Sequence, residues 1–364
     1  ADRMLGPHLR KRPPARVMNI LRLGVAEICE LGEAPHGVVN AAVSLAAADQ
    51  QSARLKGLVN AVLRKVSAET AKWATLPVPR LPKWLRKPLI ADYGKAAVEA
   101  MEATFYASPP LDLSPRDDAQ QVARATGGRL LATGSVRLNE WGQVSTLPGF
   151  DEGDWWVQDA AAALPARILA PERGARVLDL CAAPGGKSLQ LAAMGARVTA
   201  LDISKTRMKR VAENLARCRL SAEMVTADAR AFDAPAFDAI LLDAPCTATG
   251  TIRRHPDLPH AKDGSDFPAL FALQEELIDQ ALSLLKPGGR LVYCTCSLLI
   301  DEGEEQVRDA LARHDGLTCE PEAYALPGID AAWLTEEGGL RLRPDYWADQ
   351  GGMDGFYIAA LRKG

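Results

Sequence analysis

The chain has 364 residues, 48% of them hydrophobic and 24% charged, which is enough for two or three globular domains with apolar cores. It contains no apolar run long enough for a transmembrane helix and no charged-then-apolar leader, so we expect neither a membrane protein nor a secreted one. The net charge of −3 is uneven: residues 1–90 carry 15 Lys and Arg against 6 Asp and Glu, a net of +9, which leaves −12 for the remainder.

Residues 16–68 have the apolar spacing of amphipathic helices. A first helix is predicted over residues 15–31, where apolar side chains recur three and four positions apart (Val17, Ile20, Leu21, Val25 and Ile28). A second helix is predicted to start at Pro35, and a third covers residues 55–64. We therefore expect an all-helical domain over residues 1–72. Its basic charge favours a polyanionic partner such as RNA, the alternative being ordinary surface charge on a packing module.

Two segments of mixed character follow the helical domain. Residues 73–89 are rich in Pro, Trp and basic side chains, which predicts a linker. The stretch after it combines a predicted helix at 95–105 with strand-like pieces such as 136–138, so residues 73–150 are expected to form a linker and a small α+β domain. An alanine-rich helix is predicted after Asp159, to about Leu169.

From residue 175 onward, strand-like and helix-like segments alternate. Strands are predicted at 175–180, 197–202, 223–226, 237–243 and 290–295, with a last strand at 356–361. Helices are predicted at 187–194, 204–217, 269–285 and 301–313. This alternation is typical of an α/β fold whose mostly parallel sheet carries helices on both faces, here over residues 151–364. Ligands of such sheets bind at the carboxyl ends of the strands.

The loop after the first of these strands has the composition of a ligand-binding turn. It joins a buried strand to a helix through Cys181-Ala182-Ala183-Pro184-Gly185-Gly186-Lys187. Glycines let the backbone approach a ligand, and the helix N-terminus offers free N–H groups. The spacing fits neither a P-loop nor a dinucleotide fingerprint, so the ligand is expected to be something other than a triphosphate or NAD. An ordinary αβ turn is the alternative.

Acidic side chains stand at the ends of three further strands. Asp202 follows the second strand, where a carboxylate is suited to bind two ribose hydroxyls. Asp228 follows the third strand and is suited to accept a hydrogen bond from an adenine amine, and Asp243 ends the fourth. A single residue of this kind is often only a helix cap. Three of them at one edge of a sheet favour a binding crevice.

The seven cysteines include two at neighbouring strand ends. Cys246 follows Pro245 in a tight loop, and Cys296 follows the fifth strand. Adjacent strands lie ~5 Å apart, so both sulfurs are expected in one pocket. Cys294 is expected in the core, and a metal site that uses it with Cys246 lacks a fourth ligand, so no metal is expected. An odd number of cysteines without zinc spacing favours a reduced, cytoplasmic location.

Several stretches of the sequence resemble a known family. Residues 178–187, 242–250 and 293–297 match the RNA cytosine-5 methyltransferases, as do Arg253-Arg254-His255-Pro256-Asp257 and Leu285-Lys286-Pro287-Gly288-Gly289. The helical segment ahead of them resembles about the second half of the RNA-binding NusB-like domain, with the opening helices missing or shortened. As a whole, the chain is similar to the RsmB (Sun) group, the 16S rRNA cytosine-967 methyltransferases.

The resemblance implies an enzyme with a Rossmann-like methyltransferase domain and S-adenosylmethionine as the methyl donor. The substrate it implies is 16S rRNA, either naked or in a small-subunit precursor, and we expect a monomer with no membrane partner. The implied donor site comprises Cys181, Ala182, Ala183, Pro184, Gly185, Gly186, Lys187, Asp202, Asp228 and Asp243.

The resemblance also assigns roles in the chemistry. Cys296 matches the family nucleophile, and Cys246 matches the second cysteine, which assists product release. Lys187 is suited to lower the pKa of the Cys296 thiol, and Asp243 to hold the edge of the base or to accept from the donor's amine. The alternative is a non-catalytic RNA-binding or ribosome-assembly factor on a methyltransferase scaffold. Because both cysteines and all the strand-end acids are present, the enzyme is favoured.

Overall fold

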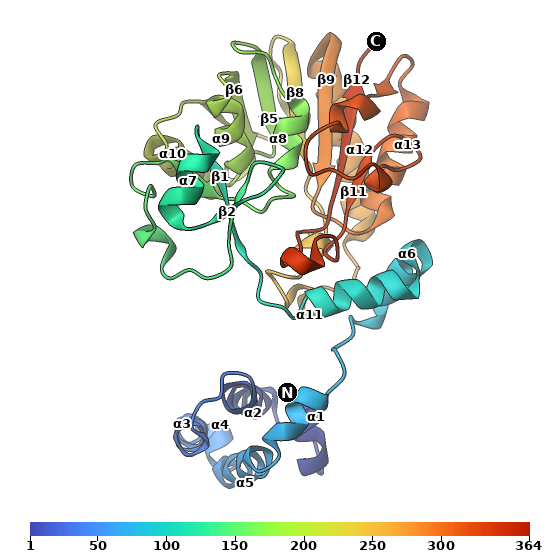
Figure 1. Cartoon of the computed structure of the whole chain (residues 1–364). Coiled ribbons are helices and arrows are strands. Elements are labelled where there is room, and N and C mark those ends of the chain that lie inside the picture. The colour runs from blue at the N-terminus through green and yellow to red at the C-terminus, as the bar shows by residue number, and fades with distance from the viewer. The chain divides into compact units, whose positions relative to one another are not determined.

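The computed structural model describes all residues from 1 to 364 and divides into two compact units, Ala1–Val78 and Pro79–Gly364 (Figure 1). No helix in either unit is both long enough and apolar enough to span a bilayer. The first unit extends past residue 72 because Trp73, in a short 3-10 helix, donates its indole N–H to Glu30 at 2.7 Å.

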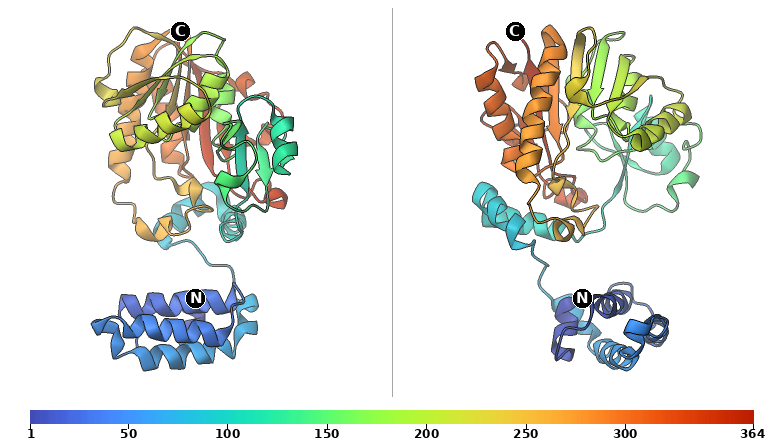
Figure 2. Two further views of the ribbon diagram at one scale, coloured as in Figure 1. Left: turned by 90° about the vertical axis from the view of Figure 1, so that its left-hand side faces the viewer. Right: turned by 180° about the vertical axis from the view of Figure 1, so that it is seen from behind.

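The first unit is all helical, as the apolar spacing predicts. Its helices are α1 (Asp2–Leu5), α2 (Ala15–Cys29), α3 (Pro35–Ala47), α4 (Gln50–Ala53) and α5 (Lys56–Ser67). The three long ones, α2, α3 and α5, lie side by side (Figure 2). Helices α2 and α5 pack closely at Gly24, where a Cβ atom would lie 2.7 Å from Leu63 Cδ1. Asp49 caps α4 by accepting hydrogen bonds from two backbone N–H groups of its first turn.

The segment expected as a linker ends earlier than its composition predicts. It gives way to α6 (Lys83–Thr104), a helix interrupted at Gly94, whose φ is +79°. Leu85 and Leu89 on its inner face are fully buried in an apolar cluster. Burial of this face stabilises the helix despite Pro88, which lacks the N–H that an internal turn requires.

A small antiparallel sheet follows α6. Its strands are β1 (Leu111–Pro115), β2 (Arg129–Leu130), β3 (Val136–Leu138) and β4 (Trp155–Val157), in the order β2-β3-β1-β4, with α7 (Ala119–Thr126) packed against it. The strand predicted at 136–138 is therefore confirmed. The small sheet reaches beyond residue 150, because Trp156 of β4 pairs with Ser114 of β1.

The large sheet has the predicted α/β alternation. Its strands are β5 (Arg176–Leu180), β6 (Arg197–Asp202), β7 (Glu223–Thr226), β8 (Phe237–Asp243), β9 (Leu285–Thr295), β10 (Thr318–Cys319), β11 (Leu340–Leu342) and β12 (Phe356–Arg362). Its order is β10-β12-β9-β8-β5-β6-β7, with β11 beside β12. Strands β5 to β9 are parallel, and β12 is antiparallel to β9. The helices are α8 (Leu164–Leu169), α9 (Gly186–Ala193), α10 (Lys205–Arg217), α11 (Leu258–Ala261), α12 (Phe267–Leu284) and α13 (Glu304–Arg313).

Both faces of the large sheet are covered by helices (Figure 2). Leu241 and Val292 lie in an apolar cluster with residues of α8, whereas Leu242 and Tyr293, one position further along the same strands, lie in a cluster with residues of α12. Successive side chains of a strand point to opposite faces, so this alternation places the two helices on opposite sides of the sheet. The predicted two-sided sheet is confirmed.

Helix α8 is shorter than the predicted alanine-rich helix. The Asp159 carboxylate accepts the N–H of Ala161 at 2.9 Å, and this local hydrogen bond forms a turn in competition with helical pairing. The same carboxylate binds Arg253 at 2.6 Å. Asp159 therefore fixes the segment between the small sheet and α8 in a non-helical form.

Candidate active site

A cavity of about 470 Å³ opens at the carboxyl ends of β5, β8 and β9. This volume lies within the range of small-molecule sites, about 300–1,000 Å³. Its lining combines polar groups and aromatic rings, among them Trp156, Lys187, Asp243, Arg254, Cys296 and Phe356. Three of these, Lys187, Asp243 and Cys296, are site residues that the sequence predicts, and the fold brings them to one place.

The two predicted cysteines lie side by side. Cys246 Sγ and Cys296 Sγ are 3.5 Å apart, which places a hydrogen bond between the two sulfurs. Cys296 lines the cavity, whereas Cys246 does not. The two thiols are therefore not equivalent: only Cys296 faces the space that a substrate would occupy.

The hydrogen bond between the sulfurs also separates the two thiols chemically. Contact with Cys296, followed by burial, raises the pKa of Cys246 well above its usual value. Cys246 therefore remains a protonated thiol at neutral pH and can donate its S–H to the sulfur of Cys296. A thiolate at Cys296 would gain a hydrogen-bond donor from this arrangement.

A buried polar cluster holds the loop that carries Cys246. Glu302, which is fully buried, accepts the backbone N–H of Thr247 at 2.9 Å and its hydroxyl at 2.5 Å. Gln274 donates to Glu302 at 3.0 Å and to the carbonyl of Pro245 at 2.8 Å. At the other end of the loop, the Gly250 N–H donates to the carbonyl of Cys296 at 2.9 Å. These contacts fix the two cysteines relative to one another, and no pattern in the sequence indicates them.

Lys187 and Asp243 form an ion pair within the cavity lining. Lys187 Nζ donates to Asp243 Oδ2 at 2.7 Å, and the ammonium lies 5.3 Å from the centre of the Phe356 ring. Burial alone would lower the pKa of Lys187, but the Asp243 carboxylate outweighs it and raises that pKa above its usual value. The buried thiol of Cys294 also lies 3.5 Å from Asp243 Oδ1, and its burial confirms its place in the core. Lys187 is thus charged and bound to Asp243.

The loop predicted to bind a ligand has a constrained backbone. Gly185 has a φ of +102°, and a Cβ there would lie 3.1 Å from Val211, so glycine is required at this position. Ala182, Pro184 and Gly186 line the cavity, and Gly186 begins α9. Cys181 lies outside this lining, and burial raises the pKa of its thiol to about 12.

Asp202 lies beside this loop but outside the cavity lining. Its Oδ2 accepts the N–H of Ala183 at 3.2 Å, and its Oδ1 accepts the N–H of Ser204 at 2.8 Å. The exposed Arg207 lies over it and forms an ion pair at 2.9 Å. The carboxylate is only 1% exposed, so a ligand reaches it only if Arg207 moves.

Asp228 occupies a different environment from the other two acids. Its carboxylate accepts the Arg230 N–H at 3.0 Å and pairs with the Arg230 side chain at 2.7 Å. These hydrogen bonds lower the pKa of Asp228, and the residue caps a short 3-10 helix outside the cavity lining. No group of three or more His, Cys, Asp or Glu side chains is arranged to hold a metal ion.

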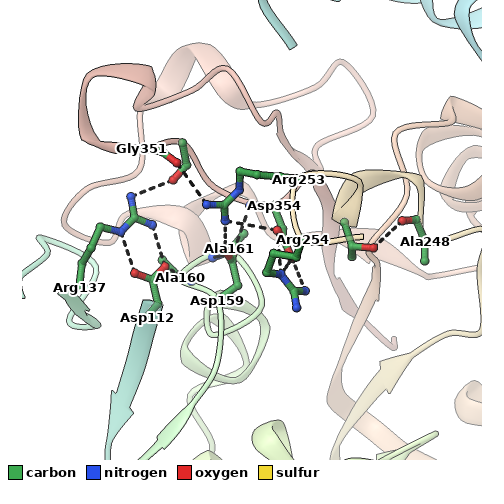
Figure 3. Close-up of polar contacts among 12 residues, drawn as sticks. Asp112, Arg137, Asp159, Ala160, Ala161, Ala248, Arg253, Arg254, Gly351 and Asp354 are labelled. Atoms are coloured by element: carbon green, nitrogen blue, oxygen red, sulfur yellow. Dashed lines mark hydrogen bonds and ion pairs between the residues drawn. The ribbon is translucent and has the colours of Figure 1, made fainter. Parts of the chain in front are cut away.

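The structure adds Arg254 to the cavity lining, a residue to which the sequence assigned no role. Arg254 donates to Asp354 at 2.9 Å, and its neighbour Arg253 binds both Asp354 and Asp159 (Figure 3). The sequence signal for Arg254 is its place in the stretch 253–257, which resembles the RNA cytosine-5 methyltransferases. Its partner Asp354 is 100 residues away in a glycine-rich segment, which no local pattern could have revealed.

Two family models match the chain. Residues 166–362 match the family described as 16S rRNA methyltransferase RsmB/F, and residues 2–68 match the NusB family. Among curated relatives, ribosomal RNA small subunit methyltransferase B of Pseudomonas putida is 40% identical over 85% of this chain and 73% of its own length. The protein of the same name from Vibrio cholerae is 37% identical over 96% of this chain and 82% of its own length.

Solved structures show the same fold. A methyltransferase homologue from Pyrococcus horikoshii, 27% identical, superposes with a TM-score of 0.66 over 78% of this chain and 95% of its own. NSun6 from the same organism, 21% identical, superposes with a TM-score of 0.65 over 78% of this chain and 98% of its own.

The match to the NusB family begins at residue 2, so it includes the one-turn helix α1 that opens the first unit.

Proposed function

Because the chain belongs to the 16S rRNA methyltransferase RsmB/F family, and is thus an S-adenosylmethionine-dependent rRNA methyltransferase, we propose that it methylates C5 of a cytosine in 16S rRNA with Cys296 as a covalent nucleophile. The observation that carries this proposal is the cysteine pair, with sulfurs 3.5 Å apart and only Cys296 facing the cavity. We further propose that the target is of the cytosine-967 type and that the protein acts as a monomer.

Cytosine C5 needs covalent activation because the aromatic ring is a poor nucleophile at that carbon. Addition of the Cys296 thiolate to C6 forms a C–S bond, breaks the aromaticity and moves an electron pair toward C5. C5 would then form a bond to the methyl group of a bound sulfonium donor, while the methyl–sulfur bond breaks and its electron pair stays on the sulfur, so that the donor departs as a neutral thioether. Loss of the C5 proton returns an electron pair to the ring and expels the thiolate from C6. Cys296 is therefore regenerated, and the net change at the base is a methyl group in place of a proton.

Cys246 is suited to assist the second half of this reaction. Its raised pKa keeps it protonated while Cys296 adds to the base, so it does not compete as a nucleophile. Its S–H lies within hydrogen-bond distance of the Cys296 sulfur, where it stabilises the departing thiolate. Removing Cys246 should therefore slow release more than addition.

Asp243 is suited to recognise the cytosine. Its carboxylate forms an ion pair with Lys187 at 2.7 Å, and a carboxylate in an ion pair accepts hydrogen bonds but donates none. The 4-amino group of cytosine is a donor that carboxylates bind in nucleic-acid complexes. We therefore assign Asp243 to the base edge and Lys187 to holding that carboxylate in place.

The loop at 181–187 and Asp202 fit S-adenosylmethionine, which supplies an electrophilic methyl group on a sulfonium. Gly185 supplies the positive φ that the loop requires, Gly186 lines the cavity, and Asp202 presents a carboxylate at the end of β6 for ribose hydroxyls. Asp228 is a weaker candidate for the adenine amine, because Arg230 already occupies its oxygens.

Donor binding should depend on Asp202. Asp202→Ala leaves two ribose hydroxyls without an acceptor and is expected to cost about 1–3 kcal/mol, roughly 5- to 150-fold in Kd. Calorimetric titration with S-adenosylmethionine measures this loss. Arg207→Ala is the matched control: it frees the oxygens of Asp202 and should not weaken binding. An unchanged Kd for Asp202→Ala would remove this residue from the donor site.

The substrate is proposed to be an accessible cytosine of 16S rRNA. A base in a buried cavity must leave its stack, and this costs least in a loop or bulge. The direct test maps 5-methylcytosine in ribosomal RNA from cells with and without the gene. Loss of one methylated position in 16S rRNA supports the proposal. An unchanged 5-methylcytosine pattern with loss of another methyl mark contradicts it.

The first unit should supply part of the RNA affinity. It carries 11 Lys and Arg against 6 Asp and Glu, a net of +5, and the other four cations of residues 1–90 lie in the second unit. Deleting residues 1–78 is expected to weaken 16S rRNA binding and flatten its salt dependence, because fewer counterions are released. Filter binding from low to moderate salt measures both. Donor affinity should persist, and an unchanged salt slope would make the unit a structural module.

A further inference from the structure

The cavity that Cys296 faces extends far from that sulfur. Its lining includes Arg217, the last residue of α10, and Phe150, in the loop before β4. Helix α10 follows β6, and β6 is separated from β9 by three strand spacings, about 14 Å. The α10 side of the cavity is therefore distant from the base that Cys296 would attack, and nothing in the proposed reaction uses it.

The charged side chains of this lining are almost all paired. Five of the six form an ion pair with a side chain of opposite charge: Asp112 with Arg137, Asp159 with Arg253, Lys187 with Asp243, and Arg254 with Asp354. Arg217 is the exception: it forms no ion pair, and Asp154, in the loop with Phe150, is bound by Arg116 instead. The one uncompensated charge at the cavity wall is therefore positive, which favours an anionic ligand.

One edge of the Arg217 guanidinium is anchored and the other is free. Nη1 donates to the carbonyl oxygens of Phe150 at 2.7 Å and Trp155 at 3.0 Å, and Cζ lies 4.3 Å from the centre of the Phe150 ring. Nε and Nη2 have no hydrogen-bond partner in the protein, and neither is among its buried unpartnered atoms, so solvent reaches both. Arg137 uses this same pair of nitrogens to bind both oxygens of Asp112. The free edge of Arg217 is therefore suited to bind two oxygens of one anion.

An exposed apolar residue lines the same cavity. Val157 is 51% exposed and lies two residues after Trp155 on β4, about 7 Å along the strand from the residue whose carbonyl binds Arg217. A single-stranded nucleotide offers an anionic phosphate next to the apolar face of a base, and its binding sites combine a cation with a surface for that face. Arg217 and Val157 supply these two features.

We propose that Arg217 and Val157 form a subsite for a nucleotide that neighbours the target cytosine. The guanidinium binds a phosphodiester of the RNA strand, and the base of that nucleotide lies against Val157. The subsite rests on the proposed function, because the strand that it holds is the one whose cytosine reaches Cys296.

The carboxylate of S-adenosylmethionine is the other anion to be considered at Arg217. Asp202, the proposed ribose ligand, lies just before α10, whereas Arg217 ends this helix. The helix has 13 residues and is thus about 20 Å long. The ribose and the carboxylate of one donor molecule are too close together to span this length, so the RNA strand is the anion that fits.

The test measures binding of a short, labelled single-stranded RNA with one central cytosine to the full chain by fluorescence anisotropy, from low to moderate salt. Arg217→Met is expected to weaken this binding roughly tenfold and to lower the slope of log Kd against log salt by about 0.7, because one phosphate contact is lost. Arg217→Lys keeps the charge and should restore most of the slope. Arg210→Met removes an exposed arginine of α10 that lies outside the lining, so it is the matched control and should bind as the wild type does.

A second variant tests the subsite if Arg217→Met does not fold. Val157→Asp places a carboxylate at a position that is already exposed, and it should also weaken RNA binding. The affinity for S-adenosylmethionine, measured by calorimetry, should stay unchanged in both variants. The proposal is overturned if Arg217→Met keeps the wild-type salt slope, if Val157→Asp binds the RNA normally, if the wild type does not bind it, or if donor affinity falls instead. Binding needs no turnover, so a wild type that forms no 5-methylcytosine would contradict the proposed function and leave this result intact.

Discussion

Cys246→Ala is expected to lose turnover and to accumulate protein covalently joined to RNA, whereas Cys296→Ala is expected to lose turnover without any such complex. Addition to C6 requires only the nucleophile that faces the cavity, and that residue is Cys296. Release requires the thiolate to depart, and the donor that stabilises it is the Cys246 thiol at 3.5 Å. Loss of a positioned proton donor costs about 10²–10⁴-fold in rate. Turnover by Cys296→Ala should fall below detection.

The measurement is a denaturing gel of each variant after incubation with S-adenosylmethionine and labelled 16S rRNA. Cys246→Ala should give a slow-migrating band that survives denaturation and disappears in the double variant. Cys319→Ala, which changes a cysteine outside the cavity, is the control and should turn over normally without a band. A band with Cys296→Ala and none with Cys246→Ala would reverse the two roles. Full activity in both variants would end the proposal of covalent catalysis.

The fold could be predicted where local pattern and tertiary packing agree. Parallel strands buried on both faces are short apolar runs, and this is why 237–243 was recognised and is β8. The segment at 83–89 was missed because its prolines and basic residues are typical of a linker. Its helix depends on burying Leu85 and Leu89 against residues distant in sequence. Likewise, β1 carries Ser114 and Pro115 and has no clear apolar alternation. Its pairing with β3 and β4 could therefore not be predicted from the sequence.

The residues of the candidate site could be predicted where they stand at the carboxyl end of a strand or directly after it. Cys296, Asp243 and Lys187 come together because parallel strands end at one edge of the sheet. The position of Asp202 behind Arg207 could not be predicted, because it depends on side-chain placement. The buried partners of the Cys246 loop are distant in sequence: Glu302 lies 55 residues from Thr247, and Gln274 lies 29 residues from Pro245, so no local spacing relates them to the loop.

A second large effect, on the free energy of unfolding, is expected when one arginine is removed from a buried charge network that joins the small sheet to the large one. Arg253, with a fully buried side chain, binds Asp159 at 2.6 Å and Asp354 at 3.3 Å, and donates to the carbonyl of Gly351 at 3.1 Å (Figure 3). Arg137 binds Asp112 and donates to the carbonyl of Gly352 at 2.8 Å. The two arginines therefore bind one glycine-rich segment, residues 350–354, one from β3 of the small sheet and the other from the segment that follows the Cys246 loop.

Arg253→Met is expected to destabilise the second unit by about 3–5 kcal/mol, because it leaves Asp159 and Asp354 facing each other as buried carboxylates. This loss of unfolding free energy should depend on pH in a defined direction. Burial already raises the pKa of Asp354 to about 6, above 3.8 in the unfolded chain, so the folded state binds the extra proton and this group stabilises the fold below pH 4. That contribution is lost as the pH rises through 6, and more steeply once Arg253 is absent.

The difference in unfolding free energy between wild type and Arg253→Met should therefore be largest above pH 6 and shrink as the pH falls toward 4. Urea unfolding at several pH values, followed by the fluorescence of the buried Trp155 and Trp156, measures it. Arg313→Met is the matched control, because its carboxylate partners Glu275 and Asp279 are 50% and 44% exposed, so water largely replaces its pairing. It should cost no more than about 1 kcal/mol. Equal losses in the two variants, or a loss for Arg253→Met that does not change with pH, would show that buried charge does not explain the contribution of Arg253.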